Sequence, residues 1–132
     1  MKITADTNVL IRAVVKDHPA QAEAASDILR RATLIAIPLP CLCEFVWVLR
    51  RAYDFNDTDI AAAMRALLAT DKVATNRPAA EAGLAHHEAG GDFADGVIAH
   101  EGTWLGGETF TSFDRKATTL LARQGKKINL LP

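Results

Sequence analysis

Apolar positions along the chain follow two spacings, and these predict its secondary structure. Short continuous apolar runs such as Leu34–Ile37 are typical of strands buried in a parallel sheet. Between the runs, apolar residues recur every three or four positions, as on one face of an amphipathic helix. Strands are expected at residues 2–6, 34–37, 72–75, 109–111 and 128–131. Helices are expected from 8, 19, 40, 57, 78, 93 and 114, the fourth capped by Asp57 and the sixth ending near 101.

This order of strands and helices predicts the fold class. Strands that alternate with helices indicate an α/β fold, with a small parallel sheet flanked by helices on both faces. No repeat or low-complexity linker interrupts the pattern, so residues 1–132 are expected to form a single domain. In such folds, functional sites form beyond the carboxyl ends of the strands.

Composition and charge limit the possible partners. The 49% hydrophobic content is ordinary for a globular protein, and no apolar run is long enough to cross a membrane, so a cytoplasmic protein without an anchor is expected. Net charge is −1, so any polyanion must bind a local basic rim. Candidates for this rim are Arg50-Arg51, Arg115-Lys116 and Lys126-Lys127. The two cysteines, Cys41 and Cys43, are expected to be reduced thiols, since no further Cys completes a zinc site.

Four acidic residues stand where an apolar segment meets an expected helix: Asp6, Glu44, Asp95 and Asp114. A carboxylate beside buried apolar residues is costly unless it is paired, neutralised or bound to a metal. The topology of a parallel sheet would bring all four to one edge. We therefore expect one site for a hard divalent cation.

Carboxylates and water are the ligands that Mg²⁺ and Mn²⁺ prefer. A metal held by such a cluster suits phosphodiester hydrolysis, because it polarises the phosphoryl group and activates water. Thr7, Asn8 and Ser112 flank the acids and are candidates to orient them, while Thr7 and Asn8 are also candidates to cap a helix.

Four segments of the chain resemble the PIN-domain family, and in particular the VapC toxins of bacterial toxin–antitoxin pairs. The order and spacing of the acids in these segments fit a small domain of this size. The segments are Asp6-Thr7-Asn8-Val9-Leu10, Glu44, Asp92-Phe93-Ala94-Asp95-Gly96-Val97-Ile98-Ala99 and Thr111-Ser112-Phe113-Asp114-Arg115.

The resemblance implies a three-layer PIN-like fold and a metal-dependent endoribonuclease. It also implies a homodimer that a small VapB-like antitoxin inhibits, and an RNA substrate such as a tRNA or rRNA loop. By the same resemblance, Asp6, Glu44, Asp95 and Asp114 become the Mg²⁺ or Mn²⁺ ligands. Asp92 either joins this cluster or caps the helix that follows it.

Three other functions remain open from the sequence. A phosphatase or phosphotransferase could use a strand-end Asp as nucleophile, although such enzymes typically carry a second Asp where this chain has Asn8. A protein-interaction module could bind a basic peptide in an acidic pocket. A nuclease of the same fold could act on DNA, since the metal chemistry does not require a 2′-hydroxyl.

The remaining histidines and tryptophans are expected to have structural roles. Adjacent histidines point to different faces of a helix, so His86 and His87 are expected on a solvated face. Trp104, in a glycine-rich stretch, is expected to pack as a lid over the core, with stacking on an unpaired base as the alternative. Trp47 is expected in the core or on a dimer face.

Overall fold

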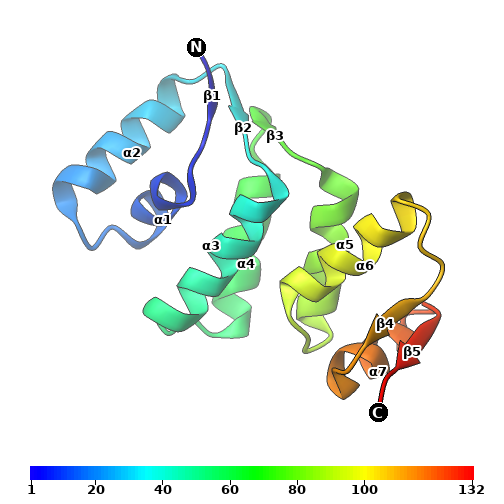
Figure 1. The fold of residues 1–132 in the computed structure, drawn as a ribbon. Helices are drawn as coiled ribbons and strands as arrows, with labels where there is room; N and C mark the ends of the chain where they lie inside the picture. Colours follow the sequence, from blue (N-terminus) through cyan, green and yellow to red (C-terminus); the bar gives the residue numbers. More distant parts are fainter. The chain divides into compact units, whose positions relative to one another are not determined.

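The computed structural model describes residues 1–132 as seven helices and five strands (Figure 1). The chain divides into two compact units, Met1–Arg77 and Pro78–Pro132, which we describe separately as unit 1 and unit 2. Unit 1 contains β1 (Lys2–Thr4), α1 (Thr7–Val15), α2 (Pro19–Arg31), β2 (Leu34–Ala36), α3 (Leu39–Ala52), α4 (Asp57–Leu68) and β3 (Val73–Ala74). Unit 2 contains α5 (Arg77–Glu88, whose first residue closes unit 1), α6 (Phe93–Trp104), β4 (Phe110–Ser112), α7 (Arg115–Arg123) and β5 (Ile128–Leu130).

The sheet of unit 1 has the order β1-β2-β3, and both pairs are parallel. Ile35 lies at its centre, paired with Ile3 on one side and with Val73 on the other. Both crossovers run in the same direction along the sheet, so right-handed connections place their helices on one face. The contacts of α1 with both α2 and α3 agree with this. Burial of Phe45 and Leu49 on α3 forms much of the core.

Two basic side chains donate hydrogen bonds to carbonyl oxygens at the ends of helices in unit 1. Nζ of Lys72, just before β3, donates to the carbonyl oxygens of Leu29 (2.8 Å) and Arg30 (2.9 Å) in the last turn of α2. The guanidinium of Arg77 donates to the carbonyl oxygen of Leu68 at the end of α4. Carbonyls in a last helical turn lack partners within the helix, and a cation there also complements the helix dipole. These hydrogen bonds connect the C-terminal ends of α2 and α4 to the segments before and after β3.

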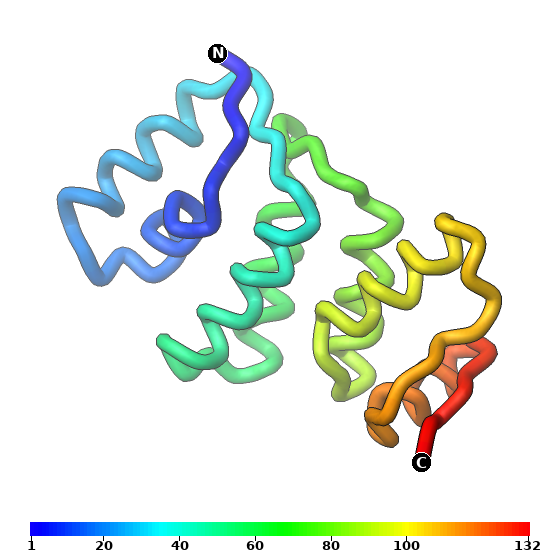
Figure 2. The backbone as a smooth tube through the Cα atoms, in the orientation of Figure 1, coloured from blue at the N-terminus to red at the C-terminus, as the bar shows by residue number.

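Unit 2 pairs β4 with β5 in parallel, and the backbone trace passes from α6 through β4 and α7 to β5 (Figure 2). Two glycines set the packing of α6 on α5. A Cβ atom added at Gly96 would lie 2.7 Å from the carbonyl oxygen of Ala82 and 2.9 Å from the Cα atom of Gly83. One added at Gly83 would lie 2.8 Å from the side chains of Phe93 and Val97. The two helices therefore approach as closely as they do because both positions lack a side chain.

The α/β class, the strands and the parallel pairing predicted from the sequence are confirmed, with element ends shifted by a few residues. The predicted cap of α4 was wrong by one residue. Asn56 caps this helix by accepting from the Asp59 amide at 2.8 Å, and Asp57 is its first residue. The helix expected to end near residue 101 continues to Trp104. None of the helices has both the length and the apolar character needed to span a bilayer.

Replacement of Gly96 by alanine tests the α5–α6 contact. Because the added methyl would meet backbone atoms that cannot turn aside, we expect Gly96→Ala to lower the free energy of unfolding by about 1–3 kcal/mol. Gly102→Ala on the same helix is the matched control, since a Cβ there meets nothing within 4 Å and alanine favours helix by roughly 0.5–1 kcal/mol. Urea denaturation followed by circular dichroism measures both. Equal stability of the two variants would contradict the close contact.

Candidate functional site

Asp6 stands where β1 gives way to α1, and it caps that helix. Its carboxylate accepts a hydrogen bond from the Thr7 amide at 2.8 Å. A negative charge is also favourable at a helix N-terminus. The expectation that Thr7 and Asn8 themselves cap this helix was wrong, because the capping position falls on Asp6. Thr7 is instead buried, and Asn8 is exposed in the first turn.

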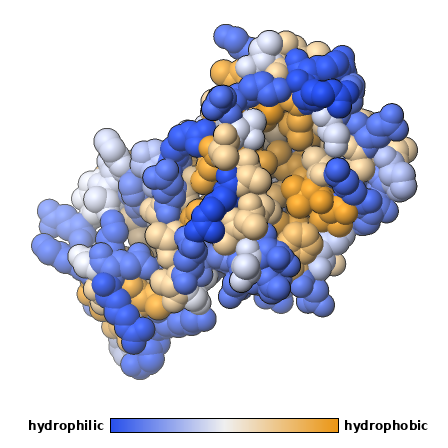
Figure 3. Space-filling view, turned by 180° about the vertical axis from the view of Figure 1, so that it is seen from behind, coloured by the Kyte–Doolittle hydropathy of each residue, from blue (hydrophilic) through white to orange (hydrophobic).

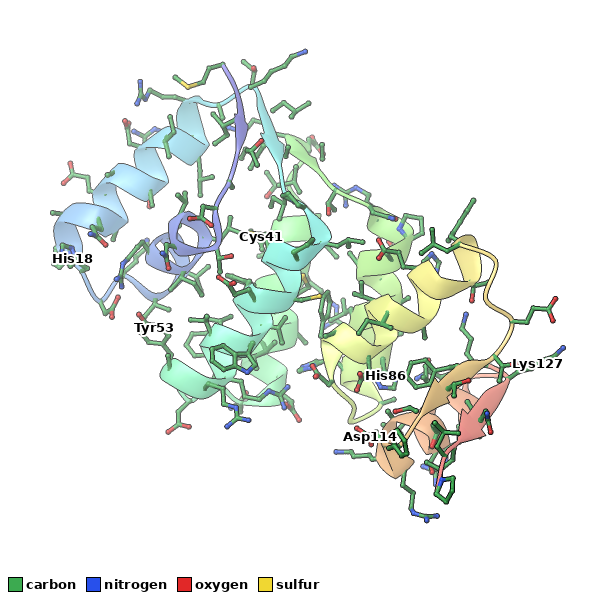
Figure 4. All side chains as sticks on the ribbon, in the orientation of Figure 1. His18, Cys41, Tyr53, His86, Asp114 and Lys127 are labelled. Carbon is green, nitrogen blue, oxygen red and sulfur yellow. The ribbon has the colours of Figure 1, made fainter.

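The thiol of Cys41 places Asp6 and Glu44 in one neighbourhood of unit 1. The Thr7 hydroxyl donates to Sγ at 3.5 Å, and the thiol donates to the carbonyl oxygen of Ala5 at the same distance (Figure 4 labels Cys41). Burial raises the pKa of the Cys41 thiol, the Thr7 hydrogen bond opposes this, and the charges of Asp6 and Glu44 raise it further. Both carboxylates are therefore within electrostatic reach of one sulfur atom.

Glu44 differs from the other three acids because it caps no helix. It lies in the second turn of α3, three residues after Cys41 and thus on the same side of the helix. Its neighbours Leu42 and Phe45 are completely buried, whereas Glu44 itself is exposed and forms no ion pair. Local helix structure therefore gives no reason for an acid at this position.

Asp92 and Asp114 cap the two helices of unit 2 that follow them. Asp92 accepts from the Ala94 amide at 3.3 Å, at the start of α6. Asp114 accepts from the Ala117 amide at 3.0 Å, at the start of α7, and its own amide donates to the Ser112 hydroxyl at 2.9 Å. Ser112 thus supports Asp114 directly. Of the two roles expected for Asp92, capping is observed.

Asp95 lies close to two other acids of unit 2. It is the third residue of α6 and is half-buried. Burial raises the pKa of its carboxyl group, and the charges of Asp92 and Asp114 raise it further, while His86 lowers it. The charges of Asp92 and Asp114 therefore both act on the Asp95 carboxyl group.

The expectation that His86 and His87 lie on a solvated face was wrong. Both are buried, so more than one face of α5 is covered. The His86 ring occupies the space that a Cβ of Gly91 would fill, so residue 91 must be glycine while the ring lies there. Nδ1 lies 3.3 Å from the Gln124 amide nitrogen, and Nε2 is buried without a hydrogen-bond partner. Burial lowers the pKa of His86, so the neutral ring predominates at pH 7 although nearby acids oppose this.

The packing expected of Trp104 as a lid over the core was also wrong. Trp104 is the last residue of α6 and is 77% exposed, with its indole NH donating to Nε2 of His100 at 3.2 Å. Trp47 is 59% exposed on α3, which excludes the core and leaves the dimer face as a prediction. Apolar residues reach the surface in patches bordered by hydrophilic ones (Figure 3).

Two of the four predicted acids, Asp6 and Glu44, thus act on Cys41 in unit 1, and Asp114 acts on Asp95 in unit 2. Neither unit by itself holds three or more His, Cys, Asp or Glu side chains arranged to bind a metal ion. A single site made by all four acids therefore stays a prediction. Each half nevertheless has the hard oxygen donors that such a site needs.

Comparison with known protein families matches the chain to the PIN domain over residues 3–120, so the chain belongs to the PIN-domain family. The match extends across most of both units. No curated protein sequence matches this chain. PIN domains are generally metal-dependent nucleases, and they act on nucleic acid.

Removal of the Asp95 charge should stabilise the metal-free protein. The folded state raises the pKa of Asp95, so it binds the carboxyl proton more tightly than the unfolded chain does. This raised pKa makes the folded state lose stability as pH rises from the ordinary carboxyl range through the raised value. We expect Asp95→Asn to melt at a higher temperature than the wild type at pH 7 in EDTA, with the difference shrinking toward pH 3.

The control for this prediction is Asp71→Asn, an exposed acid outside any ion pair. It removes the same charge without relieving a crowded cluster. Thermal melts across the pH range measure all three proteins. The quantity to compare is the melting temperature of Asp95→Asn minus that of the wild type. If this difference were smaller at pH 7 than at pH 3, the electrostatic penalty assigned to Asp95 would be contradicted.

Proposed function

We propose that this chain is a metal-dependent endoribonuclease whose Asp6, Glu44, Asp95 and Asp114 bind Mg²⁺ or Mn²⁺. The observation that carries the proposal is the half-buried Asp95, whose pKa is raised by burial and, further, by the charges of Asp92 and Asp114. Such an arrangement is costly to the free protein and favourable to a bound cation. Because the chain belongs to the PIN-domain family of nucleases, the proposed cation would take part in catalysis.

The donor set fits these ions. Carboxylate oxygens are hard ligands, and Mg²⁺ usually keeps several waters and takes only one or two carboxylates directly. Some of the four acids would then act through water. When bound, the ion would polarise the phosphoryl group and lower the pKa of a bound water.

The chain's own residues prepare this chemistry by fixing the acids before substrate arrives. Asp6 and Asp114 are oriented by the helices they cap, and Ser112 fixes the backbone of Asp114. Preorganised charge needs no rearrangement during reaction, which is why it is effective. Asp92, Thr7 and Asn8 are accessory positions in this proposal.

The finer assignment follows the resemblance to VapC toxins. It makes the protein the toxin of a toxin–antitoxin pair, a homodimer held inactive by a small VapB-like antitoxin. The substrate would be single-stranded or looped RNA, such as a tRNA or rRNA loop, because unpaired bases can be splayed out and read. The exposed Trp47 is a candidate for the dimer face.

Metal-dependent cleavage of RNA tests the proposal. We expect metal-stripped protein to cut total cellular RNA at discrete positions when Mn²⁺ or Mg²⁺ is added, and EDTA to abolish this. Glu44→Gln and Asp95→Asn should reduce the rate on the order of a hundredfold or more. These two acids are chosen because neither caps a helix, so their loss leaves the capping hydrogen bonds intact.

The matched control is Asp71→Asn, which should cleave as the wild type does. Full activity in a folded Asp95→Asn protein would remove Asp95 from the mechanism. Equal cutting of single-stranded DNA would make the enzyme a general nuclease. A stable aspartyl-phosphate in place of cleavage would favour the phosphatase alternative.

Metal binding should also be visible without substrate. Because an ion that binds only the folded state stabilises it by mass action, Mn²⁺ at a hundredfold excess over its Kd should add about 2.7 kcal/mol. Differential scanning fluorimetry would detect the higher melting temperature. The Glu44→Gln/Asp95→Asn double variant should show no such rise. An equal rise in both proteins would place the metal elsewhere.

A further inference from the structure

Unit 2 contains a cavity of about 200 Å³ that none of the predicted acids lines. It lies between α6, the segment leading into β4, and the start of β5. The residues that matter here come from all three: Ile98 and Gly102, Glu108 and Thr111, and Lys126 and Lys127. The cavity is therefore built within one unit by segments close to 30 residues apart in sequence.

The cavity adjoins the elements that carry two of the acids. Asp95, Ile98 and Gly102 are spaced three and four residues apart, so they share one face of α6. On the other side, the cavity-lining Thr111 lies in β4, which runs on to Asp114. Seven residues of helix separate Asp95 from Gly102, about 10 Å along the axis. That distance corresponds to about three stacked nucleotides at roughly 3.4 Å each.

The side chains that line the cavity carry a net positive charge, although the cavity adjoins the elements that carry Asp95 and Asp114. Lys126 is half-buried and Lys127 is exposed at the start of β5, where Figure 4 labels it, and neither ammonium forms an ion pair. Glu108 is the one acidic residue of the lining. Ile98 adds an apolar surface that is 57% exposed. Two unpaired cations beside an apolar surface suit a ligand that has both an anionic and a flat apolar part.

We propose that this cavity is a nucleotide subsite, which binds the single-stranded nucleic acid beyond the acids. Lys126 and Lys127 contact its phosphates, and Ile98 contacts a base. The identity of the ligand rests on the proposed nuclease function. Both lysines lie after residue 120, where the match to the PIN domain ends, whereas the rest of the cavity lining lies within the matched residues.

Binding of a short fluorescent oligouridylate to the whole protein in EDTA tests the subsite without cleavage. We expect Lys126→Ala/Lys127→Ala to bind at least tenfold more weakly at low salt, measured by fluorescence anisotropy. Loss of two phosphate contacts should also reduce the slope of log K against log salt by about 1.4. The control is Lys2→Ala/Lys16→Asn in unit 1, since asparagine tolerates the left-handed backbone of Lys16 (φ 58°).

Two further variants change the cavity without touching the lysines. Gly102→Phe should block it and weaken binding, because a Cβ at Gly102 meets nothing within 4 Å and the fold is expected to accept it. Glu108→Gln should strengthen binding, because it removes the acid among the lining residues. Wild-type affinity in both the double lysine variant and Gly102→Phe would overturn the subsite. So would an equally tight, lysine-dependent complex with an oligoglutamate peptide, which would make it a general anion site.

The outcomes separate this inference from the proposed nuclease. Lysine-dependent binding of the oligonucleotide without any metal-dependent cleavage would support the subsite and overturn the nuclease. Cleavage with an unchanged KM and unchanged binding in the lysine variant would support the nuclease and overturn the subsite.

Discussion

Burial of a carboxylate in the first turn of α6 is the constraint on which unit 2 depends. Burial raises the pKa of Asp95, and the charges of Asp92 and Asp114 raise it further. The same helix packs closely on α5 through Gly83 and Gly96, where no side chain separates the backbones. The close helix contact and the perturbed acid therefore lie side by side in the first turn of α6.

Three of the four predicted acids have a role in local helix structure in addition to the proposed role in metal binding. Asp6 and Asp114 hold hydrogen bonds at helix starts, and Asp95 is in the first turn of α6, where a helix dipole favours acids. Helix structure alone would therefore justify each of these three. Glu44 has no such justification, which makes it the most informative single position for function. The capping also explains how the acids can be rigid before any ligand binds.

The sequence predicted the fold well because apolar periodicity and strand runs are local signals. Parallel pairing followed from the order of elements, and Asp6 and Asp114 lie between a strand and a helix as expected. The burial of His86 could not be predicted in this way. It arises from the approach of α5 to α6, and α5 is covered through small residues such as Ala79 and Gly83 that give little hydrophobic signal. The exposure of Trp104 was not predicted because Gly102 indicated a loop, whereas α6 continues through Gly102.

Lys72 has a consequence for how unit 1 assembles. Its ammonium satisfies two carbonyls at the end of α2 from 43 and 42 residues away, so the last turn of that helix is completed only when the chain around β3 has arrived. A turn that relies on a distant partner opens together with that partner. Native-state hydrogen exchange in the final turn of α2 should therefore follow the exchange of β3 rather than that of the first turns of α2. A helix that is continuous in structure would then open in two steps, its last turn separately from its first turns.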